Sequence, residues 1–322
     1  MKAPGFWFRP PGLASLALSP LAAIWTIAAR RRQRSSGEGV GVPVVCIGNV
    51  TVGGSGKTPT VIALQEALHD ASVHVVTRGY KGSLDGPVRV DPLRHRSSQV
   101  GDEPLLLSAF GPVWVAKDRL EGARAAAKAG ARLILLDDGH QNPHLAKDLS
   151  IVVVDAATRF GNGRVMPAGP LREPVTDGLA RADCVLAIGT PDARTELLQS
   201  LPYSGPVVQA RIEPLQTGMD WQGARVLAFA GIGHPQKFFD TLNGLGANVV
   251  ATHAFGDHEP YREDRLDRLQ AEARKLGAQL VTTEKDAARL PVSFRAQVLA
   301  LPVRLRFADD AGLMDRVRSL MG

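Results

Sequence analysis

The sequence predicts a doubly wound α/β fold, in which helices cover both faces of a mostly parallel sheet. Short apolar runs rich in β-branched residues recur through the first two thirds of the chain, and helical stretches separate most of them. Strands that are apolar at every position are typical of a parallel sheet buried on both sides. The apolar runs cover residues 42–50, 73–79, 112–117, 132–139, 150–156 and 184–189. The helical stretches cover residues 59–69, 103–110, 118–129 and 173–182.

A second, smaller α/β domain is expected after the first. Its strand-like runs cover residues 225–233, 248–255 and 279–285, and its helical stretches cover residues 235–245, 262–276 and 311–320. Two further runs, 206–214 and 299–307, flank this domain and are predicted to pair as a short two-stranded connector, which returns the C-terminal helix to the first domain. The predicted divisions are residues 1–34, 35–208, 209–307 and 308–322: an N-terminal segment, the main domain, the smaller domain with its connector strands, and a C-terminal helix.

Composition narrows the class of partner. The 322 residues carry a formal net charge of +6 and only 5% aromatic residues. Positive charge suits nucleic acid, an anionic membrane or a phosphorylated substrate. No basic patch is interleaved with aromatic residues, so we expect no nucleic-acid partner, and no segment indicates an obligate protein partner. Cys46 and Cys184 both lie in strand-like apolar runs, which predicts buried thiols in a reducing compartment and no disulfide.

The N-terminal segment is apolar and then strongly basic. Residues 12–29 carry no charge, and "RRRQR" follows at residues 30–34. A secretory signal would place its charge before the apolar run. The run is barely long enough to span a bilayer, and Pro20 would disturb a spanning helix. We therefore predict a membrane-associating helix over residues 12–34 that lies on an anionic membrane surface. The alternative is a helix packed on the soluble core.

The stretch "GNVTVGGSGKTPT" resembles a nucleotide-binding P-loop. The usual pattern is G-x-x-x-x-G-K-[ST], and here Thr51 stands at the first position. A strand precedes the stretch, and Pro59 suits the first turn of a helix after it. Backbone N–H groups of such a loop hold phosphate, the lysine neutralises it, and the next hydroxyl binds Mg²⁺. The predicted loop residues are Gly53, Gly54, Ser55, Gly56, Lys57 and Thr58. The alternative, a plain turn between strand and helix, leaves Lys57 unexplained.

Acidic residues follow another strand. In the run 132–139, Asp137 and Asp138 directly follow the apolar residues, at a strand end where a carboxylate can hold a metal ion or its water. The alternative is an aspartate that caps the next turn. Asp102 and Glu103 stand at a predicted helix start, where acids are favourable in any case. A kinase would use such a carboxylate as general base toward a hydroxyl.

Three further polar clusters are candidates for substrate contact. Arg78 and Tyr80 follow the second strand, Arg172 and Glu173 lie in a long Gly/Pro loop, and Asp257 stands beside His258 after a strand of the smaller domain. A solvated turn or loop is the alternative for the first two clusters, and a structural histidine is the alternative for the third.

Together these stretches make the sequence similar to the tetraacyldisaccharide 4'-kinase family of Gram-negative bacteria. The matching stretches are "GNVTVGGSGKTP", "TRGYKG", "VGDEP", "LLDDGHQ", "PAGPLREP", "GIGHPQKFF", "FGDHEPY" and "VTTEKDAARL". They follow the family's order over nearly the whole chain. The resemblance also fits Thr51, because the family has threonine at the first position of its P-loop. Departures occur at Thr77, Lys81, His140 and Asn142, and they leave the roles of positions 140 and 142 open.

The resemblance implies an activity and assigns roles. The family uses ATP and Mg²⁺ to phosphorylate the 4'-hydroxyl of an acylated glucosamine disaccharide 1-phosphate. It implies a catalytic set, an ATP-binding set, a metal-binding set and a substrate-binding set. The catalytic set is Lys57, Asp102, Asp138 and His258. The ATP-binding set is Thr51, Gly53, Gly54, Ser55, Gly56, Lys57, Thr58 and Arg119. The metal-binding set is Thr58, Asp137 and Asp138. The substrate-binding set is Arg78, Tyr80, Glu103, Gln141, Arg172, Glu173 and Asp257.

These roles predict where the protein lies in the cell, and one alternative function remains. A kinase with a lipid acceptor and an N-terminal membrane-associating helix is expected at the cytoplasmic face of the bacterial inner membrane, as a peripheral or monotopic protein. The rival is a membrane-associated P-loop ATPase or GTPase switch that does not phosphorylate a lipid. A non-enzymatic membrane adaptor is a weaker alternative, because Lys57, Thr58, Asp137 and Asp138 are all intact.

Overall fold

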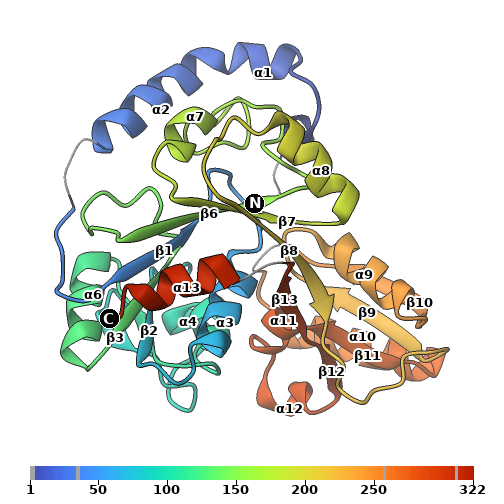
Figure 1. The fold of residues 1–322 in the computed structure, drawn as a ribbon. Helices are drawn as coiled ribbons and strands as arrows, with labels where there is room; N and C mark the ends of the chain where they lie inside the picture. The colour runs from blue at the N-terminus through green and yellow to red at the C-terminus, as the bar shows by residue number, and fades with distance from the viewer. Residues whose placement is uncertain (1–3, 34–36, 257–258, 309–310) are drawn as a thin grey trace. The chain divides into compact units, whose positions relative to one another are not determined.

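The computed structural model describes residues 4–33, 37–256, 259–308 and 311–322. The chain forms two compact units (Figure 1). The larger unit contains Ala3–Ile212 and Leu305–Gly322, and the smaller unit contains Glu213–Arg304. Asp257 and His258, predicted as substrate-binding and catalytic, lie outside the described residues.

A nine-stranded sheet forms the centre of the larger unit, in the order β13-β8-β7-β6-β1-β5-β2-β4-β3. The strand pairs from β8 to β4 are parallel, and β3 is antiparallel to β4. The strands are β1 (Val44–Gly48), β2 (Val73–Thr77), β3 (Val88–Arg89), β4 (Val113–Val115), β5 (Leu133–Asp137), β6 (Leu149–Asp155), β7 (Cys184–Ile188), β8 (Val207–Pro214) and β13 (Val303–Phe307). β1, β2, β5, β6 and β7 are buried along their whole length, as a parallel sheet covered on both faces requires.

Helices cover both faces of this sheet, which makes the unit doubly wound. In β1, Val45 and Ile47 join the core beneath α3 and α13, whereas Val44 and Cys46 join the core beneath α6. A third cluster packs α7 and α8 against β6 and β7. The helices are α3 (Lys57–Ala67), α4 (Ser97–Val100), α5 (Asp102–Leu107), α6 (Arg119–Lys128), α7 (Val175–Leu179), α8 (Pro191–Ser200) and α13 (Ala311–Ser319). The predicted doubly wound α/β class is confirmed.

The N-terminal segment belongs to the larger unit. It contains a short 3₁₀ helix (Gly5–Phe8), α1 (Leu13–Ala17) and α2 (Ser19–Arg32). Pro20 lies in the first turn of α2, where a missing N–H is tolerated, so it does not interrupt the helix. Among the described residues, no helix combines the length and the apolar character needed to traverse a bilayer.

The smaller unit is a four-stranded parallel sheet in the order β10-β9-β11-β12. Its elements are β9 (Arg225–Ala230), α9 (Pro235–Gly244), β10 (Asn248–Ala254), α10 (Glu263–Leu276), β11 (Gln279–Thr283), α11 (Glu284–Ala287), α12 (Val292–Arg295) and β12 (Val298–Leu301). α9 covers one face of this sheet, and α10 and α12 cover the other. The prediction of a second α/β unit agrees with this arrangement.

One predicted element is divided in the structure. The run 299–307 was expected to be a single connector strand, but Pro302 interrupts it and divides it into two strands. Residues before the proline form β12 in the smaller sheet, and residues after it form β13, which lies next to β8 in the nine-stranded sheet. Proline has no N–H to donate to a ladder, which explains why the run changes sheet at this residue.

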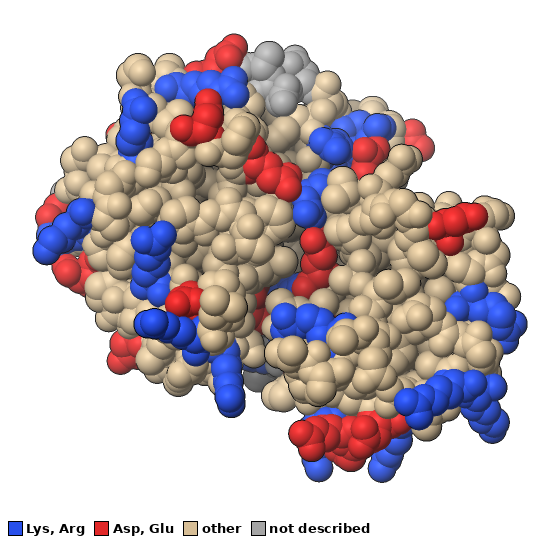
Figure 2. Space-filling model, turned by 90° about the horizontal axis from the view of Figure 1, so that it is seen from below, with Lys and Arg blue, Asp and Glu red and all other residues tan. Residues whose placement is uncertain are grey.

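Charged side chains are dispersed over the side of the molecule drawn in Figure 2. Lys and Arg residues are interspersed there with Asp and Glu residues, and uncharged surface separates them (Figure 2). The formal excess of +6 is therefore not gathered into one basic stripe on that side.

Candidate active site

The loop between β1 and α3 has the conformation that a phosphate-binding loop needs. Gly53 and Gly56 have φ angles of 114° and 96°, in the left-handed region that favours glycine. A Cβ at position 56 would also lie 2.5 Å from Cδ1 of Ile188. α3 begins at the next residue, Lys57, so the loop ends at a helix N-terminus. Such a terminus offers free N–H groups to an anion.

Thr51 occupies the first position of this loop because the chain is still extended there. Thr51 forms an antiparallel bridge with Leu171, and Val52 N donates to the Pro170 carbonyl at 2.8 Å. In the same ladder, Arg172 N donates to the Val50 carbonyl at 2.8 Å. β-branched residues suit extended backbone, so no glycine is needed at this position. The loop 164–173 is thereby joined to the entrance of the phosphate loop.

A buried asparagine holds the two ends of the loop together. Asn49 is fully buried, and its amide nitrogen donates to Ser55 Oγ at 2.9 Å and to Thr51 Oγ1 at 3.3 Å. The predicted loop residues are therefore brought together by a residue that was not among the predicted site residues. Its signal in the sequence is a polar side chain directly after a buried strand.

The paired aspartates lie beside the phosphate loop, because β5 is the direct neighbour of β1 and Asp137 is in register with Ile47. Asp137 is buried and accepts a hydrogen bond from Thr77 Oγ1 at 3.0 Å. Burial, with the nearby charges of Glu103 and Asp138, raises the pKa of Asp137 to about 7. Thr77, the last residue of β2, was not predicted as a site residue.

Asp138 is surrounded by cations. Lys57 Nζ lies 3.6 Å from Asp138 Oδ1, and the Arg172 guanidinium donates to both carboxylate oxygens at 2.8 and 3.0 Å. Burial opposes ionisation, but Lys57 and Arg172 outweigh it and hold the pKa of Asp138 well below its usual range. Arg119 at the start of α6 lies within 3.4 Å of the Asp138 carbonyl. Burial lowers the pKa of Arg119, Asp138 opposes this shift, and Arg78 adds to it.

Gln141 contacts Arg172 directly, and Glu173 contacts Gln141 in turn. Gln141 accepts from Arg172 at 3.1 Å and donates to the Asn49 carbonyl and to Glu173, both at 2.8 Å. Glu173 is buried and receives two hydrogen bonds from Arg181, at 2.7 and 2.8 Å. Glu173, predicted to bind substrate, is thus occupied by an internal ion pair. Arg181 was not predicted, and a single arginine in a helical stretch gave no signal.

Helix α5 brings one of its two acids, Glu103, to the same site. Asp102 and Glu103 form the first residues of α5, and Asp102 is buried. Thr58 Oγ1, in the first turn of α3, donates to Glu103 Oε1 at 3.3 Å. Arg78 and Tyr80 are exposed after β2, and the Lys81 ammonium lies 5.9 Å from the Tyr80 ring centroid.

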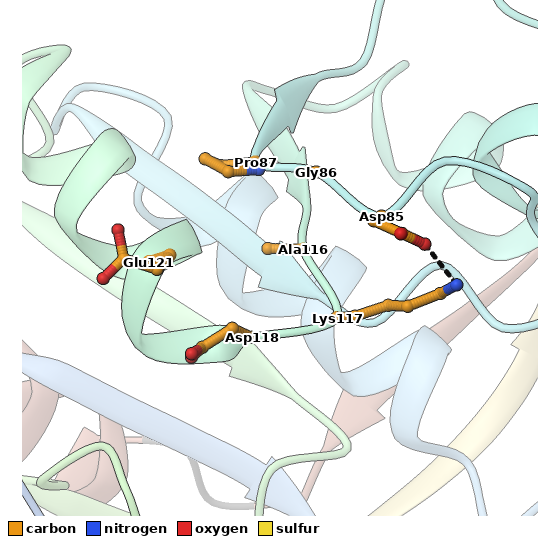
Figure 3. Close-up of a pocket in the computed structure, with 7 residues that line it drawn as sticks. All are labelled: Asp85, Gly86, Pro87, Ala116, Lys117, Asp118 and Glu121. Carbon is orange, nitrogen blue, oxygen red and sulfur yellow. Dashed lines mark ion pairs between the residues drawn. The ribbon is translucent and has the colours of Figure 1, made fainter.

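A separate cavity of about 240 Å³ lies beyond the end of β4. Figure 3 shows Asp85 and Lys117 pointing toward one another as an ion pair at its rim, with Asp118 and Glu121 on the side of α6. Asp118 accepts from Leu120 N at 2.9 Å and so caps α6. None of the residues predicted to bind ATP, metal or substrate lines this cavity.

Comparison with known proteins identifies the family. The family model described as "Tetraacyldisaccharide-1-P 4'-kinase" matches residues 14–322. A tetraacyldisaccharide 4'-kinase from Dinoroseobacter shibae is 58% identical, over 97% of this chain and 96% of that protein. The corresponding protein from Jannaschia sp. is 54% identical, over 98% of this chain and 97% of that protein.

A solved structure agrees with the sequence comparisons. The crystal structure of LpxK from Aquifex aeolicus in complex with ATP has a TM-score of 0.77 and 25% sequence identity, and the match covers 96% of this chain and 100% of that chain. The model match, the sequence identities and the shared fold all extend over nearly the whole length. The chain belongs to the tetraacyldisaccharide-1-P 4'-kinase family.

Proposed function

We infer that the protein is a tetraacyldisaccharide 4'-kinase, which transfers the γ-phosphoryl group of ATP to the 4'-hydroxyl of an acylated glucosamine disaccharide 1-phosphate in lipid A biosynthesis. The observation that carries this inference is the phosphate loop Gly53–Thr58 beside the paired aspartates at the end of β5, in a chain that matches the family from residue 14 to residue 322. A membrane-associated ATPase switch is not favoured, because the relatives are named as kinases over nearly their whole length.

The cations of the site suit a triphosphate. Lys57 and Arg172 neutralise Asp138 in the structure, and phosphate oxygens would compete with that carboxylate for the same donors. Charge that develops on the transferred phosphoryl group is stabilised by fixed donors of this kind. Gly53, Gly54, Ser55, Gly56 and Thr58 would contribute loop contacts, and Arg119 would add a further positive charge.

The donor set also fits Mg²⁺. Among the described residues, no three His, Cys, Asp or Glu side chains form a ready-made metal group. Mg²⁺ at nucleotide sites is held by one or two carboxylates together with phosphate oxygens and water. Thr58, Asp137 and Asp138 would hold the ion, which would offset the charge of the β- and γ-phosphates. The raised pKa of Asp137, about 7, follows from burial beside two other acids, and a bound cation would lower it.

Asp102 would accept the proton of the acceptor hydroxyl as that oxygen attacks the γ-phosphorus and ADP leaves. The resemblance pairs this residue with His258, and Arg78, Tyr80, Gln141 and Asp257 are proposed to contact the acceptor.

The acceptor is a lipid, so the enzyme would work at a membrane surface. The apolar side chains exposed on α1 and α2 support this proposal: Leu13, Leu16, Leu21, Ile24 and Ile27. Arg30, Arg31 and Arg32 end α2, where they would meet anionic head groups at the cytoplasmic face of the inner membrane.

The test is transfer of radiolabelled γ-phosphate from ATP to an acylated disaccharide 1-phosphate in detergent micelles. The wild-type protein should label the lipid. Asp102→Asn should reduce kcat by about 10²–10⁴-fold, the usual contribution of a general base. Unlabelled lipid together with ATP hydrolysis that does not respond to the acceptor would reject the kinase in favour of the ATPase switch.

A further inference from the structure

The N-terminal helix α2 is fastened to two loops that carry side chains of the phosphate site. Trp25 Nε1 donates to the carbonyl of Arg172 at 3.0 Å. Gln33, the C-cap residue directly after α2, donates from Nε2 to the carbonyl of Gln141 at 3.0 Å. Arg30 adds an ion pair with Asp177 at 2.6 Å, where α2 passes α7 (Figure 1).

The two residues held through their carbonyls place their side chains in the site. The Arg172 guanidinium donates to both oxygens of Asp138 and to Gln141 Oε1. The Gln141 amide donates to the carbonyl of Asn49, whose side chain holds Thr51 and Ser55. A continuous series of hydrogen bonds therefore connects α2 with the phosphate loop.

The rest of the N-terminal segment is bound to the same loop. Ser15 is buried, and its hydroxyl donates to the Ala168 carbonyl at 2.8 Å. Trp7 Nε1 donates to the Pro167 carbonyl at 3.1 Å. In α2, Ala22 is buried, whereas Ile24 and Ile27 are 65% and 54% exposed. At 3.6 residues per turn, Ala22, Trp25 and Gln33 lie on one side of the helix and the two isoleucines lie on the other.

We propose that Trp25 and Gln33 are positioning residues for phosphoryl transfer, because they fix the backbone from which Arg172 and Gln141 reach the phosphate site. This inference rests on the proposed function. Catalytic groups lose effect when they are misplaced by a fraction of an ångström to an ångström. The loss of one neutral hydrogen bond weakens the restraint without removing it, so we expect each substitution to reduce kcat by about threefold to tenfold.

The experiment compares Trp25→Phe and Gln33→Glu with wild type. Phenylalanine keeps an aromatic ring without the N–H, and glutamate keeps the shape of glutamine but presents an acceptor in place of a donor. Ala23→Ser, at an exposed position of the same helix, is the matched control. With acceptor in detergent micelles, both variants should lower kcat. Trp25→Phe acts through Arg172, which the proposed function assigns to the triphosphate, so this variant should also leave the acceptor KM unchanged. Amide exchange at Arg172, whose N–H is bonded to Val50, should become faster in both variants and not in the control.

If Trp25 and Gln33 had a structural role alone, the substitutions would lower the thermal midpoint of unfolding. They would not lower kcat selectively while the acceptor KM stayed the same. The proposal is overturned if kcat and Arg172 exchange equal those of wild type, or if kcat and the amount of folded protein fall together. The exchange measurement needs no lipid. If wild type fails to label any acylated disaccharide 1-phosphate, the proposed function fails, and unchanged exchange at Arg172 is still the result that sinks the positioning role.

Discussion

At the scale of single residues, the phosphate loop needs glycine at positions other than the first position of the usual motif. Thr51 lies in an extended bridge with Leu171, and the positive φ angles fall at Gly53 and Gly56. The sequence could identify the loop from Lys57 and Thr58, but the reason for a threonine at the first position depends on pairing with a segment about 120 residues away in the chain. Such pairing leaves no local signal.

We expect Gly56→Ala to weaken ATP binding by about tenfold or more. The left-handed conformation costs a non-glycine residue roughly 1–2 kcal/mol, and the new Cβ would meet Ile188 at 2.5 Å. Thr51→Ser, which keeps both the extended backbone and the hydroxyl that accepts from Asn49, should bind ATP within about twofold of wild type. Titration with a fluorescent ATP analogue measures both. Equal affinity of Gly56→Ala and wild type would contradict this account of the loop.

At the scale of elements, the strands around the site were accessible from sequence because β1, β2, β5, β6 and β7 are buried along their whole length and are therefore apolar at nearly every position. The run 299–307 was assigned wrongly as one strand, since the sheet to which each half belongs is decided by long-range pairing on either side of Pro302. The site shows the same division. Carboxylates at strand ends were found, whereas Asn49, Thr77 and Arg181 act through contacts made only after folding.

The hydrogen bond between Trp114 of β4 and His74 of β2 predicts that the stability of the protein depends on pH. Trp114 Nε1 donates to Nδ1 of His74 at 3.2 Å, which requires an unprotonated nitrogen. Burial, together with Arg89, lowers the pKa of His74 below its usual value of 6.5. The unfolded chain therefore binds a proton that the folded protein does not. This contribution to the free energy of unfolding is complete above about pH 6.5 and decreases as the pH falls toward the lowered pKa.

Urea unfolding of wild type and His74→Gln at pH 7.5 and pH 5.5 isolates this effect. Glutamine keeps an acceptor for Trp114 but does not titrate in this range. The wild type should lose more stability between the two pH values than the variant does. Equal losses would show that His74 has the same pKa in the folded and unfolded states.

At the scale of the whole molecule, the proposed membrane surface of α2 can be tested apart from catalysis. Ile24→Asn combined with Ile27→Asn removes two exposed apolar side chains from the side of α2 opposite Ala22. Burial of such a side chain contributes about 1.5–3 kcal/mol, so binding to vesicles with anionic phosphatidylglycerol should weaken by about tenfold or more. Co-sedimentation measures it, and Ala23→Ser serves as control. Unchanged binding would reject this surface.

The sequence predicted two units and a return of the C-terminal helix to the first unit through paired strands, but it did not predict the change of sheet at Pro302. β8 leads out of the nine-stranded sheet, and β13 returns to the same sheet directly beside it. After β13, α13 contributes Leu313, Met314 and Val317 to the core of the larger unit. The C-terminal helix therefore completes a domain that began about three hundred residues earlier.

Because the chain leaves the nine-stranded sheet through β8 and re-enters it through the neighbouring strand β13, the segment between these strands is an insertion in the larger unit. Lengthening, shortening or exchange of that insertion needs no rerouting of the strands on either side. Residues 215–302 can therefore be altered while the nine-stranded sheet keeps its strand order. The same join is a natural place to build chimeras that pair one phosphate-binding fold with different inserted modules.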